Sequence, residues 1–141
     1  MDKLISLCMI VKNEEKVLAR CLDSVRDAVD EIIIMDTGST DRTKEIALRY
    51  TPHVYDHEWN QDFSAAKNDA IRRATSRWIL VLDADEYFDK TDALELRRFL
   101  ENETPDPGIV YNFPIINFLG KTLSNPTLME SYADRVFPNH M

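Results

Sequence analysis

Residues 78–86 have the sequence WILVLDADE, in which five apolar residues are followed by three acidic residues within four positions. An apolar run without polar alternation is typical of a strand covered on both faces, as in parallel sheets. Open α/β sheets bind their ligands outside the carboxyl ends of such strands. The stretch therefore predicts a buried strand that places Asp83 and Asp85 at a ligand-binding edge.

The sequence before this strand alternates between strand-like and helix-like segments. Leu4–Val11 and Glu31–Met35 are apolar runs of strand length, and His53–His57 is a weaker strand candidate. Helices are expected between them over about 14–28, from cap candidates at 39–41 to about 50, and from a cap at Ser64 to about 74. This alternation predicts an α/β fold, an open, mostly parallel Rossmann-like sheet with helices on both faces.

The pattern changes after residue 90. Thr91 or Asp92 is a cap candidate for a short helix to about residue 102, residues 109–119 are rich in β-formers, and residues 135–137 are a last short strand. The chain then ends without a closing element. We therefore expect a sheet that is incomplete at its C-terminal end, with an open edge through which copies of the chain can associate.

Composition narrows the class of protein. The chain is 44% hydrophobic and 30% charged, a globular balance, and it has no apolar run long enough to cross a bilayer. The first apolar run leads directly into charged residues and lacks a cleavage site, so we expect a cytoplasmic protein in which Cys8 and Cys21 are buried thiols. A net charge of −8 without basic clusters argues against nucleic acid as a partner. A phosphorylated ligand would need another source of positive charge.

Polar residues follow three of the expected strands at the same edge. Asp36 begins the sequence DTGSTD, where Gly38 permits a tight turn and the carboxylate can accept from a nucleoside N–H or hydroxyl; a plain capping turn explains the segment equally well. Lys12 and Glu14 end the first strand, where the start of a helix is an equal explanation.

The acidic turn at residues 83–85 predicts a cation site. Its two carboxylates can be aimed at one point, the arrangement preferred by Mg²⁺ or Mn²⁺ when diphosphate oxygens complete the shell. A solvated acidic turn is the alternative. The position of residues 83–85 directly after a buried strand favours the cation site. The cation would supply the positive charge that this acidic chain lacks.

Three segments together resemble the family 2 glycosyltransferases of GT-A fold, the nucleotide-diphospho-sugar transferase fold. They are CMIVKNEE at residues 8–15, IMDTGSTD at 34–41 and LVLDADE at 80–86, and their order and spacing also match. The sequences of these motifs are similar to those of two bacterial branches, the lipopolysaccharide-core β-1,4-glucosyltransferase-like proteins and those whose transferase domain precedes helical repeats. The resemblance covers roughly residues 4–90 and implies the N-terminal portion of such an enzyme, in bacterial cell-envelope polysaccharide synthesis.

The resemblance implies transfer of a sugar from a nucleotide diphosphate donor, in particular a UDP-sugar, to an acceptor hydroxyl that a carboxylate base activates. It further implies dependence on Mn²⁺ or Mg²⁺, inversion at the sugar, and a saccharide, lipid-linked or protein acceptor. We expect a single domain over residues 1–141, with 1–90 binding the nucleotide sugar and 91–141 beginning the acceptor side.

The resemblance also implies roles for individual residues. Val11, Lys12 and Glu14 would line the nucleoside pocket, and Asp36 would contact the base or the ribose, with Asn68 alongside. Asp85 would bind the metal. Asp83 would also bind the metal and would lie near the ribose and the diphosphate. Thr37 departs from the pattern, because many members have a second aspartate there. The catalytic residues stay unknown, since the family's base would lie beyond Met141, and Glu130, Asp134 and His140 are not assigned to that role.

Other classes of function fit less well. A noncatalytic nucleotide-sugar-binding or interaction module is the alternative to an enzyme. A phospho-receiver domain would need a lysine after a late strand and paired acids with the first strand. Dinucleotide and P-loop sites need glycine-rich loops, and the chain has three glycines, far apart in the sequence.

Overall fold

The computed structural model describes residues 3–58, 62–103, 116–117 and 136–139. Its elements are β1 Ile5–Val11, α1 Leu18–Val25, β2 Glu31–Asp36, α2 Thr43–Leu48, β3 Val54–Asp56, α3 Phe63–Arg73, β4 Trp78–Val81, β5 Glu86–Tyr87, α4 Lys90–Glu101, β6 Ile116–Asn117 and β7 Val136–Pro138. The predicted alternation of strands and helices is therefore confirmed. Most of the predicted strand at 109–119 lies outside the described residues, and β6 falls within it.

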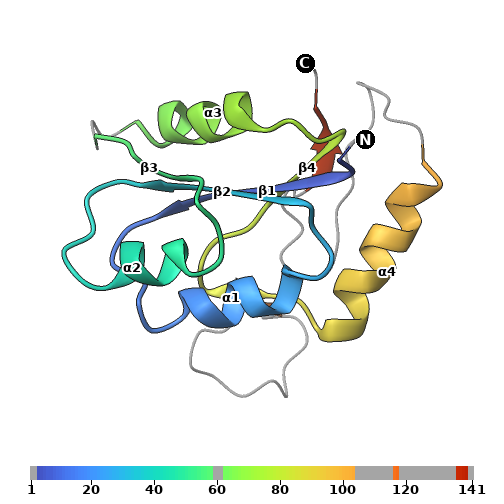
Figure 1. The fold of residues 1–141 in the computed structure, drawn as a ribbon, viewed down its shortest axis with the longest axis horizontal. Helices are drawn as coiled ribbons and strands as arrows, with labels where there is room; N and C mark the ends of the chain where they lie inside the picture. The colour runs from blue at the N-terminus through green and yellow to red at the C-terminus, as the bar shows by residue number, and fades with distance from the viewer. Residues whose placement is uncertain (1–2, 59–61, 104–115, 118–135, 140–141) are drawn as a thin grey trace.

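The main sheet has five strands in the order β3-β2-β1-β4-β7. β2 and β4 pair with β1 in parallel, β3 pairs with β2 in parallel, and β7 runs antiparallel to β4. In Figure 1, α3 covers one face of the sheet, while α1, α2 and α4 lie on the other side. The predicted open, mostly parallel sheet with helices on both faces is confirmed.

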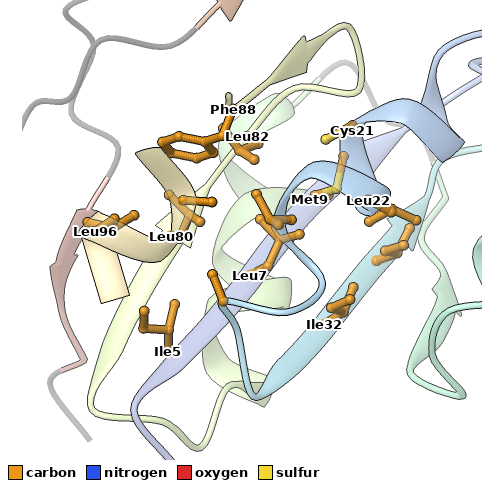
Figure 2. Packing of buried hydrophobic residues seen from close by; sticks show 14 of the residues in the cluster. Ile5, Leu7, Met9, Cys21, Leu22, Ile32, Leu80, Leu82, Phe88 and Leu96 are labelled. Atoms are coloured by element: carbon orange, nitrogen blue, oxygen red, sulfur yellow. The ribbon is translucent and has the colours of Figure 1, made fainter. Parts of the chain in front are cut away.

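The core has a layer on each face of the sheet, because successive residues of a strand point to opposite faces. Alternate residues of β1 from Ile5 to Val11 join the cluster formed with α1 and α4, and Figure 2 shows Leu7 and Met9 there near Leu22 of α1. Cys8 packs instead with α3, whose buried alanines let the helix lie close to the sheet.

Both cysteines are buried free thiols, as predicted. Burial, and then the nearby Glu31 carboxylate, raise the pKa of the Cys8 thiol to about 12. The pKa of Cys21 is also raised, by burial and then by neighbouring carboxylates, the first of which belongs to Glu86. Both side chains therefore act as small, neutral core residues.

The helices begin at different residues from those that local patterns favour. Asp62, rather than Ser64, caps α3 by accepting from the Ala65 amide at 3.1 Å. Asp89, rather than Thr91 or Asp92, caps α4. In each case an earlier acid reaches an amide of the first turn, which also suits the positive end of the helix dipole. Within the described residues, no helix has the length and apolar character needed to cross a membrane.

Candidate functional site

A hollow of about 390 Å³ lies at the carboxyl ends of β1 and β4. It is lined by Ile10, Val11, Lys12, Glu14, Thr37, Asp83, Ala84 and Asp85. Five of these residues were singled out from the sequence, and they come from two strands that are about 70 residues apart in the chain but parallel neighbours in the sheet. The structure thus brings the predicted residues of the first and fourth strands together.

Glu86 forms two hydrogen bonds with the backbone of Asp83, at the start of the acidic turn after β4. The Asp83 amide donates to Glu86 Oε1 at 2.7 Å, and the Glu86 amide donates to the Asp83 carbonyl at 2.9 Å. Asp83 is exposed and Asp85 is partly buried, and neither carboxylate forms a hydrogen bond or ion pair with a described residue. Both carboxylates therefore keep their oxygen atoms available to a ligand.

The carboxylates around the hollow act on one another. Burial, and then the charges of Asp85, Asp83 and Asp41, raise the pKa of Glu14 above its ordinary value of 4.5. Such repulsion favours any positive charge placed between these groups.

Oxygen donors of this kind suit a hard divalent cation. Within the part of the chain that the structure describes, no group of three or more His, Cys, Asp or Glu side chains is placed to hold a metal ion. Asp83 and Asp85 therefore fit a cation whose remaining ligands come from a bound molecule, and a diphosphate has such oxygens.

Hydrogen bonds join the loop after β1 to the loop after β2. Asn13, with a φ of 54°, donates its amide to Ser39 Oγ at 2.9 Å and accepts from the Thr40 amide at 2.8 Å through Oδ1. The Glu14 amide donates to Thr43 Oγ1 at 2.7 Å. These bonds hold Lys12 and Glu14 at the hollow.

Further bonds between the same two loops precede α1, which starts later than predicted. The helix was expected from about residue 14, but it begins at Leu18. The Glu15 amide donates to Asp41 Oδ2 at 3.3 Å, and the Glu15 carboxylate accepts from the Arg42 amide at 3.1 Å. The Glu14 carbonyl accepts from the Leu18 amide at 3.0 Å, so these long-range bonds hold a turn that leads directly into α1.

Asp36 forms the turn after β2 with one of its two carboxylate oxygens. Its Oδ1 accepts from the amides of Gly38 at 2.8 Å and Ser39 at 2.7 Å, and Gly38 has a φ of 117° that favours glycine. Its Oδ2 is buried and has no hydrogen-bond partner among the described residues. Asp36 does not itself line the hollow, although the next residue, Thr37, does. The predicted capping turn uses one oxygen and leaves the other as an unpaired acceptor.

Asn68 is not brought to the hollow. It is exposed on α3, which packs on the other side of the sheet from α1, and it does not belong to the lining. The sequence reasoning also missed some residues, since it assigned no role at the site to Ile10, Thr37 or Ala84. Thr37 donates its hydroxyl to the Val11 carbonyl at 3.3 Å, which joins the ends of β1 and β2. Glu130, Asp134 and His140 lie outside the described residues.

The sequence model of Glycosyl transferase family 2 matches residues 6–137, nearly the whole chain. The chain belongs to this family. The glycosyltransferase predicted from the three motifs is thereby confirmed at the level of the family.

Two relatives illustrate the range of proteins that carry this domain. A TPR repeat-containing protein of Synechococcus elongatus is 53% identical over 97 residues, which cover 69% of this chain and 24% of the relative. The glycosyltransferase SunS of Bacillus subtilis is 45% identical over 85 residues, which cover 58% of this chain and 20% of the relative. The chain thus spans a quarter or less of the length of these relatives. The name of the first relative includes TPR repeats, which are helical repeats.

Solved structures share the fold. TarS residues 1–349 of Staphylococcus aureus align with a TM-score of 0.61 at 18% identity, over 96% of this chain and 47% of that one. Glucosyl-3-phosphoglycerate synthase of Mycobacterium tuberculosis, in complex with Mn²⁺, uridine diphosphate and glucosyl-3-phosphoglycerate, aligns with a TM-score of 0.52 at 23% identity, over 60% of this chain and 34% of that one. These alignments confirm the GT-A fold of this family 2 domain.

Proposed function

We propose that this domain binds a nucleotide diphosphate sugar, in particular a UDP-sugar, in the hollow and transfers its sugar to an acceptor hydroxyl with inversion. The observation that carries the proposal is the pair of carboxylates, Asp83 and Asp85, which line the hollow without a hydrogen bond or ion pair to any described residue. Solved relatives add support for the donor class, because TarS has been crystallised with UDP-GlcNAc and with UDP.

The residues of the hollow divide between the two parts of such a donor. Val11, Lys12 and Glu14 would contact the nucleoside. Asp36 lies beside the hollow, next to the lining residue Thr37, and would accept from the base or the ribose through Oδ2, which has no partner among the described residues. Asp83 and Asp85 would meet the diphosphate through Mn²⁺ or Mg²⁺, which would neutralise charge on the leaving diphosphate. We leave Asn68 out of this proposal because of its place on α3.

The two carboxylates explain why donor binding should depend on the cation. The net charge of the chain is −8, and Glu14 lies among the same acids. A diphosphate brought next to these groups would be repelled, whereas a divalent cation between them turns the repulsion into bridging contacts.

Calorimetric titration with UDP-glucose and UDP-GlcNAc, in Mn²⁺ and in excess chelator, tests the proposal. We expect micromolar to millimolar dissociation constants with the cation and no binding in chelator. Equal binding in chelator would contradict the bridging role of the metal. A failure to bind any nucleotide in Mn²⁺ would favour a noncatalytic interaction module.

The variant Asp85→Asn sharpens this test. It should weaken binding that depends on the cation without lowering the melting temperature, since the Asp85 side chain makes no hydrogen bond or ion pair with a described residue. Asp27→Asn is the matched control, because Asp27 is an exposed aspartate that does not line the hollow. If Asp85→Asn unfolded the domain, the carboxylate would be structural and the assignment would be wrong.

A further inference from the structure

Glu86 is a carboxylate residue with 0% exposure, one position after the acidic turn. Burying such a group is costly, and the cost is greater beside other acids. Glu86 Oε1 nevertheless accepts a hydrogen bond from the Asp83 amide at 2.7 Å. A charged acceptor forms a stronger bond to an amide than a neutral one does. The structure therefore uses this carboxylate for a contact that an apolar residue of the same size could not make.

The contact fixes the backbone of Asp83 at both of its polar groups. Its amide is held by the Glu86 side chain, and its carbonyl accepts from the Glu86 amide at 2.9 Å. The Cys21 thiol of α1 also donates to this carbonyl at 3.7 Å. With the peptide groups held, the turn between Asp83 and Glu86 has little freedom to rotate its two aspartates away from the hollow.

The segment that follows the turn is anchored to α1. Tyr87 lies under the Arg20 guanidinium, whose central carbon is 4.4 Å from the ring centroid. The Phe88 amide donates to Ser24 Oγ at 3.1 Å. Glu86 thus connects a segment packed on α1 to the turn that presents the acids.

We propose that Glu86 is a positioning residue that sets the affinity of the hollow for a divalent cation with a nucleoside diphosphate, by holding Asp83 and Asp85 in their orientation. This inference rests on the proposed function of the hollow. Groups that orient metal ligands through hydrogen bonds commonly change metal affinity by about 10- to 100-fold when they are replaced.

Two substitutions separate geometry from charge. Glu86→Gln removes the charge but keeps an oxygen that can accept from the Asp83 amide. Glu86→Asp keeps the charge but is shorter by one methylene, which withdraws the acceptor from that amide. If Glu86 acts by holding the turn, Glu86→Asp weakens binding and Glu86→Gln recovers most of the wild-type affinity; if it acts through its charge, the order is reversed.

Glu31→Asp is the matched control for lost stability. Glu31 is also buried, and its Oε1 accepts from the Thr75 amide at 2.8 Å at the start of β2, the opposite end of the sheet from the hollow. Its shortening should lower the unfolding midpoint in urea without changing cation binding.

The measurement is the fraction of free Mn²⁺ by electron paramagnetic resonance, with UDP present, alongside urea unfolding of each variant. We expect a loss of about 10- to 100-fold in Mn²⁺ affinity for Glu86→Asp, with wild-type affinity in Glu31→Asp. Wild-type affinity in folded Glu86→Asp, or an equal loss in Glu86→Gln, would overturn the positioning role while leaving the proposed function intact. No Mn²⁺ binding by the wild-type chain would overturn both.

Discussion

Replacing Asn13 should test how far the fastening of the two loops stabilises the fold. Asn13 has a φ of 54°, in the left-handed region that disfavours side chains other than those of Gly, Asn and Asp. Its Oδ1 accepts from the Thr40 amide at 2.8 Å and the Thr40 hydroxyl at 3.4 Å. Alanine would lose the acceptor and keep the unfavourable backbone conformation, whereas glycine would lose only the acceptor.

The two contributions can be given magnitudes. An L-residue in the left-handed conformation costs about 1–2 kcal/mol, and asparagine avoids part of this cost. The hydrogen bonds are exposed, so their net contribution lies near the lower end of the usual range, about 0.5 kcal/mol. We therefore expect Asn13→Ala to lower the free energy of unfolding by about 1.5 kcal/mol and Asn13→Gly by about 0.5–1 kcal/mol.

Equilibrium unfolding in urea measures both variants, with the slope of the transition as the check that the unfolded states are comparable. The informative quantity is the difference between the two variants, which isolates the backbone conformation. If glycine destabilised the chain as much as alanine, the left-handed conformation would not be the cause. Both variants should also bind the UDP-sugar more weakly, because the neighbours Lys12 and Glu14 line the hollow.

Two further predictions concern pH. Burial, and then the charges of Asp85, Asp83 and Asp41, raise the pKa of Glu14. The free energy of unfolding therefore falls as pH rises through the ordinary pKa of 4.5 and above it. Glu14→Gln should raise the melting temperature at neutral pH and have no effect in acid. An equal melting temperature at neutral pH would contradict this. Burial raises the pKa of Asp30, but hydrogen bonds from Arg97 and from the Leu4 and Ile5 amides have the larger, opposite effect, so the pKa lies below its ordinary value of 3.8. Asp30→Ala should therefore lower the free energy of unfolding by about 1–3 kcal/mol at neutral pH, with the difference disappearing as pH falls below the lowered pKa of Asp30, and exposed Asp27→Ala serves as control.

Hydrophobic patterning made the sheet and most of the candidate site predictable from the sequence. The unbroken apolar runs of β1, β2 and β4 indicated strands buried on both faces, and the structure has them as the three central strands. Parallel strands end at a common edge, so the acids after β4 could be placed beside Lys12 and Glu14 without coordinates. The three motifs then identified the family, which the match over residues 6–137 confirms.

Other features were decided by contacts between residues far apart in the chain. The bonds from residues 13–15 to residues 39–43, which hold the turn before α1, are not encoded by any local pattern in 14–28. Asn68 was placed alongside Asp36 by the resemblance to the family; in the structure α3 packs on the other side of the sheet from α1, and Asn68 is not part of the lining.

The same distinction holds within the acidic turn. The sequence determined that two aspartates follow a buried strand, because an unbroken apolar run is a local property that can be recognised in the sequence alone. Only the tertiary structure decided that Glu86 is fully buried and holds the Asp83 amide, and that one oxygen of Asp36 is buried without a partner among the described residues. The physical reason is that the burial and hydrogen-bond partners of a side chain are set by the elements packed around it.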